Sequence, residues 1–431
     1  MSFLNRPTPG PYFAPAERNR APRLSCSPSK RPGKLGLGTV LLLLLLSFCS
    51  FSPAAAQPGF SGAPDDTGFN FRVYPADVWG PRSGPGIGLG VVGHNLARRH
   101  DQWLLTAAPA RYEQVATAAF ASANPRRATR YVLVDSRALH TDRQWYGPPE
   151  QRTVLERTEL RTRIRVGRAL FQRTVLIQPH VTLSHQSVDA VNQPANGPDR
   201  INAALPAPGI HQTGLRAGVE FQFDTRDRPV LATQGFLLQA KWDRYVPLEG
   251  ADLQFDQVDL DAYGYLPLGG GHRFVPRLSL TLTRTRSDVP VPVFELPTLG
   301  GSRVPGWARG RFVDSDRLIG SVLYRFPLFR YEKLAAVEGH LGGHLASVYG
   351  NLSDQFTTSV SFEENPRLNS SDRPLRPAAS AGIRFAVPLR PHVSLDLAVG
   401  MSPEGATAVR LSFVRSLQSL RFPHHTSDNL R

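Results

Sequence analysis

The stretch TVLIQPHVTLSHQ, residues 174–186, alternates apolar and polar side chains along its length. Successive side chains of an extended chain point to opposite faces, so this stretch has one apolar and one polar face. The apolar face carries Val175, Ile177, Val181 and Leu183, and the polar face carries Gln178, His180, Thr182 and Ser184. Alternation over about ten residues is typical of a strand that crosses a membrane, with its apolar face toward lipid and its polar face toward a lumen.

The same pattern recurs and predicts sixteen strands, an even number, as bacterial outer-membrane barrels have. The expected strands are residues 68–75, 86–96, 102–110, 112–122, 128–139, 154–168, 173–187, 212–225, 234–246, 254–268, 272–286, 315–328, 333–349, 376–388, 391–400 and 406–415. The long connections all follow odd-numbered strands: 140–153, 188–211, 287–314 and 350–375. We therefore expect an all-β fold, a sixteen-stranded antiparallel transmembrane barrel with these four connections on its outer side and the short turn 268–271 on the other.

The composition agrees with a folded chain. Hydrophobic residues make up 41% of the sequence, which excludes a disordered protein. The net charge of +15 comes from Arg and Lys spread along the chain, with no basic cluster beside an aromatic RNA-binding motif, so we expect no nucleic-acid partner. A soluble β-sandwich is the alternative, but its strands would be shorter, about 5–6 residues on average.

The first 56 residues are expected to be a leader that contains a secretory signal peptide. A basic segment at Lys30 and Lys34 precedes an apolar core around residues 41–46 and the small residues 54–56. Both cysteines, Cys26 and Cys49, fall in this leader, so the mature chain would contain none. The expected domains are the leader (1–56), a linker (57–67), the barrel (68–417) and a C-terminal extension (418–431).

The connection after the eleventh strand contains LGGSRVPGWARGRFVDSDRL, residues 299–318. It resembles the sixth loop of bacterial surface-antigen barrels of the BamA/TamA outer-membrane assembly type, which folds back into the lumen. The tip motif is carried by Gly300, Gly301, Gly306, Trp307, Arg309, Gly310, Arg311, Phe312 and Asp314. Pro305 stands where that family has an arginine at the tip, and Arg309 or Arg303 would serve in a shifted register.

A second motif of the same family lies at the junction of the eighth and ninth strands. FDTRDRPVLATQGF matches it at Asp224, Arg226, Asp227, Pro229 and Gly235. The resemblance spans about residues 66–417. No POTRA module, the periplasmic domain usual in this family, fits between Gln57 and the first strand, and Leu323 replaces a glutamate common before the Tyr-Arg pair.

A long loop inside a barrel needs charged partners on the wall, because Arg–carboxylate pairs are directional and offset the cost of burying charge. We expect Arg303, Arg309 or Arg311 to pair with inward Glu220, Asp224 or Glu338. The arginine row Arg161, Arg163 and Arg165 would also face the lumen. The alternative is an exposed loop with solvated arginines.

The resemblance implies a non-enzymatic barrel in the bacterial outer membrane that assists protein insertion or secretion. Its partners would be outer-membrane lipid and client outer-membrane or secreted proteins, with a POTRA-bearing partner supplied in trans. The alternatives are a passive channel in which the arginine row favours anions, or a structural surface protein. No cofactor is expected. We also predict no metal site, although His340 and His344 share one strand face four residues apart.

Overall fold

The computed structural model describes residues 70–77, 87–94, 101–122, 130–147, 153–171, 174–192, 209–227, 232–301, 303–331, 335–363, 373–386 and 393–415. All of these residues belong to one compact unit within Phe51–Arg431. The leader, the linker and the C-terminal extension expected from the sequence lie outside the described residues. Among those residues no helix has the length and apolar character of a membrane-spanning helix.

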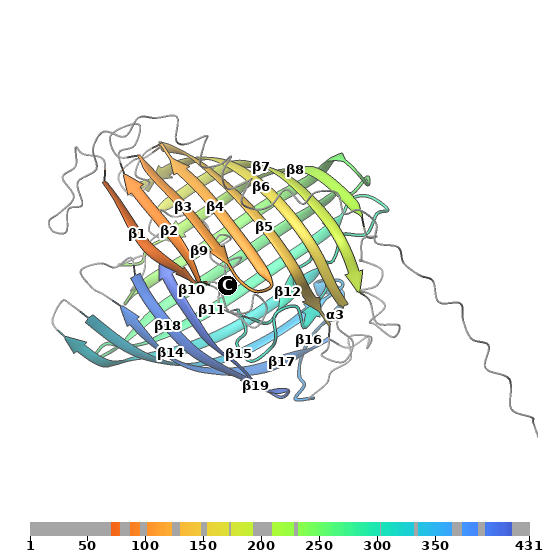
Figure 1. The fold of residues 1–431 in the computed structure, drawn as a ribbon. Coiled ribbons are helices and arrows are strands. Elements are labelled where there is room, and N and C mark those ends of the chain that lie inside the picture. Colours follow the sequence, from red (N-terminus) through yellow and green to blue (C-terminus); the bar gives the residue numbers. More distant parts are fainter. Residues whose placement is uncertain are drawn as a thin grey trace, which may run out of the picture. The chain divides into compact units, whose positions relative to one another are not determined.

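Sixteen long strands form one antiparallel meander in which each strand pairs with its neighbours along the chain (Figure 1). They are β1 (Asn70–Asp77), β2 (Ile87–His94), β3 (Gln102–Pro109), β4 (Glu113–Ala121), β5 (Arg130–Tyr146), β6 (Thr153–Leu170), β7 (Val175–Asn192), β8 (Ile210–Asp224), β9 (Gly235–Glu249), β10 (Phe255–Gly269), β11 (His272–Thr285), β14 (Asp316–Tyr331), β15 (Ala335–Tyr349), β17 (Arg373–Ala386), β18 (Val393–Ser402) and β19 (Gly405–Arg415). The first strand, β1, and the last, β19, contact each other. The predicted sixteen-stranded antiparallel barrel is thereby confirmed.

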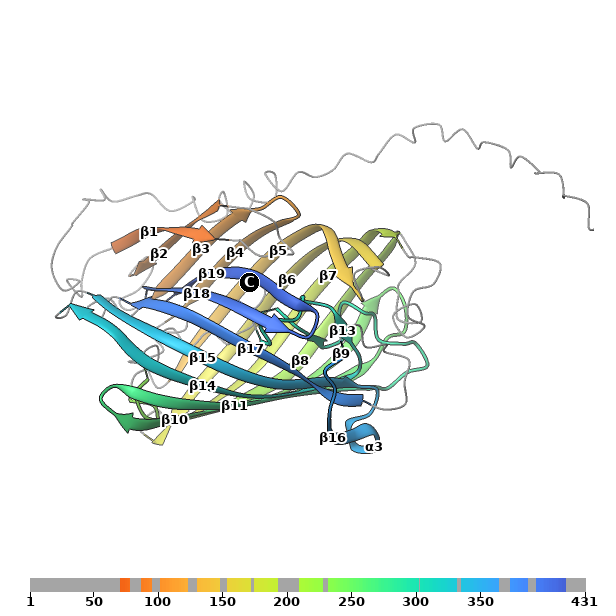
Figure 2. The same cartoon turned by 90° about the horizontal axis from the view of Figure 1, so that it is seen from below.

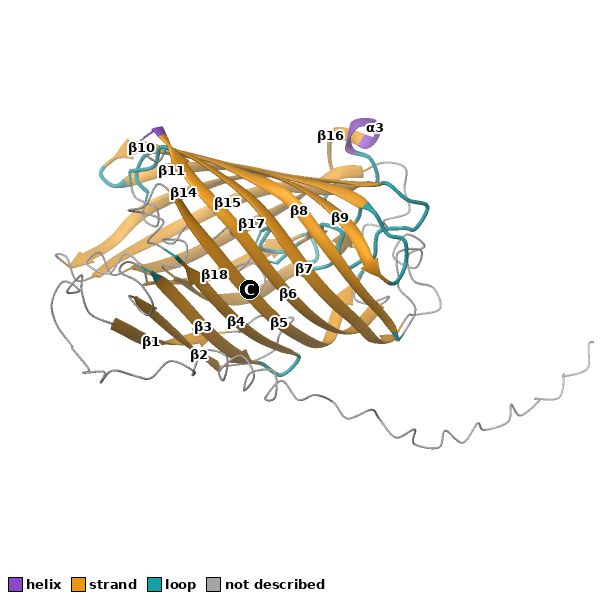
Figure 3. Ribbon diagram, turned by 90° about the horizontal axis from the view of Figure 1, so that it is seen from above, coloured by secondary structure: helices purple, strands orange, loops and turns teal. Residues whose placement is uncertain are grey.

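Three short strands and one short helix decorate the outer connections. The strands β12 (Thr298–Leu299) and β13 (Phe312–Val313) pair with each other inside the connection between β11 and β14. After β15 come the helix α3 (Leu352–Gln355) and the strand β16 (Phe356–Val360), which pairs in parallel with β17. Figure 3 shows α3 in purple beside β16.

The alternation read from the sequence separates an apolar outer face from a polar inner face. On β7, Val181 and Leu183 are 46% and 47% exposed, whereas Thr182 and Ser184 are 2% and 4% exposed. On β6, Ile164 is half exposed, and its neighbours Arg163 and Arg165 are buried. Apolar side chains that point away from the lumen are the lipid-facing band of a membrane barrel.

Several strands run past the ends expected from the sequence. β5 continues to Tyr146 through an irregularity between Thr141 and Gln144, and β7 continues to Asn192. Both extensions pair with β6, so the ladder continues where the side-chain alternation has faded. The long connection expected at 140–153 is therefore wrong, because β5 ends at Tyr146 and β6 begins at Thr153. The connection between β11 and β14 and the described residues 350–363 after β15 each follow an odd-numbered strand of the meander, as expected.

Candidate functional site

The connection between β11 and β14, residues 286–315 and here called loop 6, lies inside the curve of the strands (Figure 2). Its anchor is Trp307, which is 1% exposed. The Trp307 Nε1–H donates to the backbone oxygen of Pro377 on β17 at 3.1 Å, and its ring meets Phe312 edge-on at 5.1 Å. The rest of this buried cluster comes from the loop and from strands on both sides of it, namely Tyr146, Leu155, Val293, Leu299, Val304, Val313, Ile319, Ala346, Val348 and Ala378. Loop 6 therefore packs as a buried core inside the barrel, in agreement with the inward-folded loop that the sequence predicts.

The tip of loop 6 contacts β18 backbone to backbone, at positions where glycine leaves no side chain between them. Gly306 has φ +111°, and a Cβ placed on it would lie 2.4 Å from the backbone oxygen of Met401. A Cβ on Gly400 would lie 2.2 Å from the Gly306 nitrogen and 2.4 Å from the carbonyl carbon of Pro305. Only glycine fits at both positions, because a side chain would occupy the space of the facing backbone. This close approach occurs at the point where Pro305 replaces the arginine of the related motif.

The neighbouring glycines shape the rest of the tip. Gly300, Gly301 and Gly310 all have positive φ, at 110°, 68° and 78°. The Gly301 N–H donates to the Trp307 oxygen at 2.8 Å and closes the tip on itself. The Gly310 oxygen accepts from the Gly147 N–H at 3.0 Å, which ties the loop to the end of β5.

Two ion pairs fasten loop 6 to the last strands of the meander. Arg311, 1% exposed, donates from Nε to Oε1 of Glu404 at 2.7 Å, and Glu404 lies in the turn between β18 and β19. Asp314 lies 3.3 Å from the guanidinium of Arg373 on β17. The guanidinium of Arg311 also stacks over Phe312 at 4.7 Å. One of the loop arginines thus pairs with a carboxylate inside the barrel.

The other end of loop 6 reaches the opposite group of strands. Glu295 accepts from Arg216 on β8 and from Gln186 on β7, both at 2.6 Å. Arg157 on β6 stacks over the Phe294 ring at 4.9 Å. Since the tip contacts β17 and β18 and this segment contacts β6, β7 and β8, loop 6 crosses the lumen.

The expected partners Glu220, Asp224 and Glu338 need correction. The structure places Glu338 against Arg273 at 2.6 Å and Asp224 against Arg226 at 2.9 Å. Glu338 lies near the start of β15 and Asp224 at the end of β8, close to the short turns, whereas loop 6 enters from the other side. Glu220 is buried on β8, and Arg311 takes Glu404 instead. A pattern of alternation gives the face of a strand but not the depth in the lumen at which a residue meets the loop.

The arginine row on β6 does face the lumen, but its members differ in their partners. Arg161 pairs with Glu159 at 2.6 Å, and Arg165 pairs with Asp135 on β5. Arg163 lies between them and lines a cavity of ≈ 200 Å³ beneath loop 6. Arg309 and Arg303 of the loop line the same cavity, and Arg303 also donates to Ser279 at 3.4 Å.

The second motif forms the turn between β8 and β9. Asp227 accepts from the Thr233 N–H at 2.8 Å and from its hydroxyl at 2.6 Å, which closes the turn. Gly235 has φ +108°, and a Cβ there would lie 2.5 Å from the Thr225 oxygen. Burial alone would lower the pKa of the Arg226 guanidinium, but the hydrogen bond and charge of Asp224 raise it above its ordinary value. Pro229 lies outside the described residues.

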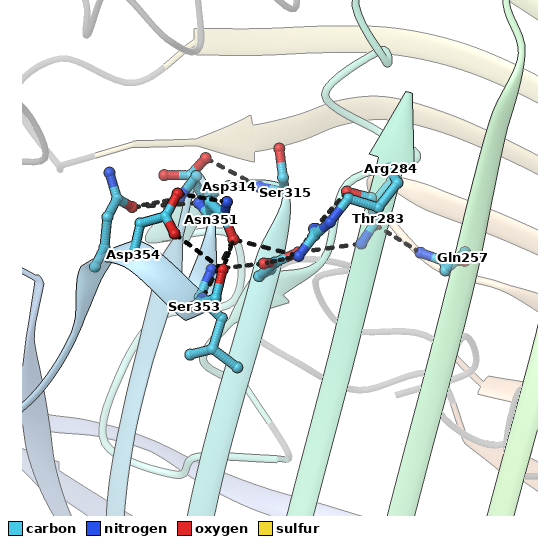
Figure 4. A network of polar contacts seen from close by, with 12 residues as sticks. Gln257, Thr283, Arg284, Asp314, Ser315, Asn351, Ser353 and Asp354 are labelled. Atoms are coloured by element: carbon cyan, nitrogen blue, oxygen red, sulfur yellow. Dashed lines mark hydrogen bonds and ion pairs between the residues drawn. The ribbon is translucent and has the colours of Figure 1, made fainter. Parts of the chain in front are cut away.

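Sequence reasoning missed a polar cluster at the outer rim. Buried Asp316, at the start of β14, accepts from Arg284 Nη2 at 2.9 Å, from the Thr283 N–H at 3.2 Å and from the Leu352 N–H at 2.8 Å. Asn351 caps α3 beside it, and Figure 4 shows Arg284, Thr283 and Asn351 around this point. The one signal in the sequence was an aspartate at the start of the strand that follows the loop motif. Glu404 was missed for a similar reason, since its Pro-Glu-Gly segment reads as an ordinary hairpin turn.

Comparison with protein families supplies the observation that decides the family. A model described as the Omp85 superfamily domain matches residues 129–416. The chain belongs to the Omp85 superfamily. A search of curated protein sequences found no match to it.

Two solved structures share the fold of this Omp85 barrel. The first is BamA from Haemophilus ducreyi lacking POTRA domains 1–3, with a TM-score of 0.56, 13% identity, and coverage of 80% of this chain and 68% of that one. The second is CdiB from Escherichia coli, with a TM-score of 0.52, 12% identity, and coverage of 83% of this chain and 61% of that one. At this identity the likeness concerns the fold. Family and fold together identify an outer-membrane barrel of the assembly and translocation class.

Proposed function

We propose that this Omp85 barrel helps a client polypeptide to insert into or cross the bacterial outer membrane, at the boundary between β1 and β19. The observation that carries the proposal is the packing of loop 6 against the last hairpin, β18 and β19. Its tip packs on Gly400 and Met401, and Arg311 holds Glu404, so the loop grips the hairpin that borders this boundary. A loop held here controls how the last hairpin sits against the first strand.

Strand length supports the same location. The strands β1, β2 and β3 have 8 residues each and β4 has 9, whereas β5, β6 and β7 have 17 or 18. β18 and β19 have 10 and 11 residues. Shorter strands share fewer ladder hydrogen bonds, so separation beside β1 breaks fewer interactions than separation elsewhere in the meander. An edge opened there would offer unpaired backbone groups to a client strand.

The finer parts of the proposal concern export and partners. The chain would be exported through the signal peptide within residues 1–56, and a periplasmic partner would supply the POTRA function in trans. The barrel would offer a route for a polypeptide and perform no chemistry on it. The second motif, with Asp224, Arg226 and Asp227, lies on the side of the short turns, where such a partner would approach.

Site-specific photo-crosslinking in cells tests the proposal. A photoreactive amino acid at Val73, exposed on β1, should capture client polypeptides that mass spectrometry identifies as outer-membrane or secreted proteins. The matched control is Leu278 on β11, which is also exposed to lipid but lies far along the meander from the boundary. Adducts at Val73 and not at Leu278 support the proposal. Equal labelling at the two positions, or no client at Val73, contradicts it.

A passive anion-favouring channel is the second candidate, and the many arginines on the inner wall favour it. Loop 6 argues against it because the loop crosses the lumen. Planar-bilayer conductance separates the two functions. A translocation barrel closed by loop 6 should conduct poorly until residues 290–312 are deleted, whereas a porin-like channel should conduct with the loop in place.

A further inference from the structure

The cavity beneath loop 6 has an unbalanced charge. Of the side chains that line it, eight are Arg or Lys, and three are Asp or Glu. The cations come from both sides of the cavity: Arg163 lies on the wall strand β6, Arg317 on β14, and Arg303 and Arg309 on the loop. Like charges held close together repel one another, so this arrangement favours an added anion.

The three carboxylates are already engaged by other groups. Glu159 pairs with Arg157 at 3.0 Å and with Arg161 at 2.6 Å. Glu295 holds Arg216 and Gln186, as described above. Asp259 accepts from the Thr281 hydroxyl at 2.8 Å. Lys241 has a partner of its own, Asp243, which is not part of the lining. The lining still contains more cations than carboxylates, and within the described part of the chain neither Arg163 nor Arg317 forms an ion pair with one of these carboxylates.

The excess of positive charge is most unfavourable at Arg163, because this guanidinium is buried. It is 6% exposed, and within the described ranges its buried Nε–H has no acceptor. Arg317 is 7% exposed and donates to two neutral oxygens, those of Thr298 and Thr281. In addition, the buried Nε–H groups of Arg157, Arg161, Arg163 and Arg317 all lack an acceptor. Buried charged donors without an acceptor are costly, because water no longer solvates them.

We propose that this cavity binds one phosphate-class oxyanion, with Arg163 and Arg317 as its principal donors. Guanidinium groups bind phosphate oxygens in a bidentate manner, and a tetrahedral oxyanion can accept from several at once. The volume of ≈ 200 Å³ is sufficient for inorganic phosphate or a small phosphomonoester.

The bound anion would join loop 6 to the wall. Arg303 and Arg309 belong to the loop, whereas Arg163 belongs to β6, and all three line the cavity. An oxyanion between them replaces repulsion with attraction and strengthens the seat of the loop. The inference concerns the cavity alone and holds whether the barrel translocates a polypeptide or conducts ions.

Calorimetric titration of the full chain in a non-ionic detergent, dialysed free of phosphate and held at constant ionic strength, tests the site. Inorganic phosphate should bind saturably with one site per chain. Arg163→Gln should weaken binding about tenfold or more, the loss expected for a charged hydrogen-bonding group. Arg244→Gln is the matched control, because it removes the same charge from a side chain that is 49% exposed and outside the cavity. A parallel titration with glycerol 3-phosphate separates the two sources, since tighter binding than inorganic phosphate identifies a phosphomonoester as the natural ligand.

A second measurement, of thermal stability, tests the same site and also shows whether each variant folds. Phosphate should raise the temperature at which the barrel loses its heat-modifiable gel mobility in the parent and in Arg244→Gln, but not in Arg163→Gln. If Arg163→Gln does not fold, Arg317→Gln takes its place with the same expectation. The absence of saturable binding to the parent overturns the proposal. Equal affinity in the parent and in the folded cavity variant also overturns it, since the anion would then be held by the general positive charge of the chain.

Discussion

Arg311 and Glu404 are 93 residues apart in the sequence and form an ion pair inside the barrel, with Nε 2.7 Å from Oε1. The arginine belongs to the loop between β11 and β14, and the glutamate belongs to the turn between the last two strands. Their side chains are 1% and 16% exposed. This pair and the backbone contact of Gly306 with Met401 fix the loop to the last hairpin from two sides.

Arg311→Ala should lower the free energy of unfolding by about 3–5 kcal/mol, because it leaves a largely buried carboxylate without its partner. Urea titration of the barrel refolded in lipid vesicles measures this change. Arg286→Ala is the control: it breaks an ion pair with Asp256, but Arg286 is 57% exposed, so the loss should be about 0–1 kcal/mol. Similar losses in the two variants would mean that the loop pair is solvated.

Gly306→Ala should unseat the tip of loop 6, since the new methyl group would lie 2.4 Å from the Met401 oxygen and φ is +111°. The expected result is faster cleavage of the loop by trypsin at its arginines in the otherwise intact barrel. Gly343→Ala is the control, because a Cβ there meets no atom within 4 Å. Unchanged cleavage in Gly306→Ala would show that the tip does not depend on this contact.

Trp307→Ala should destabilise the barrel by about 3–5 kcal/mol, the usual loss when a buried aromatic side chain is truncated. Trp307→Phe should cost less, because it keeps most of the packing and loses the hydrogen bond to Pro377. Fluorescence provides a second measure: the part of the emission that disappears in Trp307→Phe should resist quenching by acrylamide. Free quenching of that part would place the loop outside the lumen.

The mature protein should begin near Gln57 and contain no thiol, because Cys26 and Cys49 both precede the expected cleavage site. Intact-mass measurement of protein purified from outer membranes gives the first residue. Labelling with a maleimide under denaturing conditions should give no adduct. The positive control is the precursor, which still carries the leader; it is taken from the cytoplasm and labelled after denaturation. A labelled outer-membrane form would show that the leader is retained.

The sequence was sufficient for the strands but not for the partners inside the lumen. Alternation fixes which face of a strand is apolar, so residues such as Val181 and Thr182 were assigned correctly to the outside and the inside. It says nothing of how far one strand is shifted against a loop from another part of the chain. For that reason Glu338 was expected near the loop, but it lies against Arg273, and Glu404 was overlooked. The ends of β5 and β7 were placed too early because backbone pairing, not side-chain pattern, extends them.

The meander has a consequence for the order in which the protein forms. Each strand pairs with its sequence neighbour, so hairpins can form one after another, with little chain entropy lost in closing each turn. Loop 6 breaks this local order, because its tip needs Gly400, Met401 and Glu404, which come about a hundred residues later in the chain. The tip of loop 6 therefore cannot pack in its final position until the hairpin of β18 and β19 has formed. Seating of the loop and arrival of that hairpin should form a single late step, and variants of either partner should slow this step while leaving the earlier hairpins unaffected.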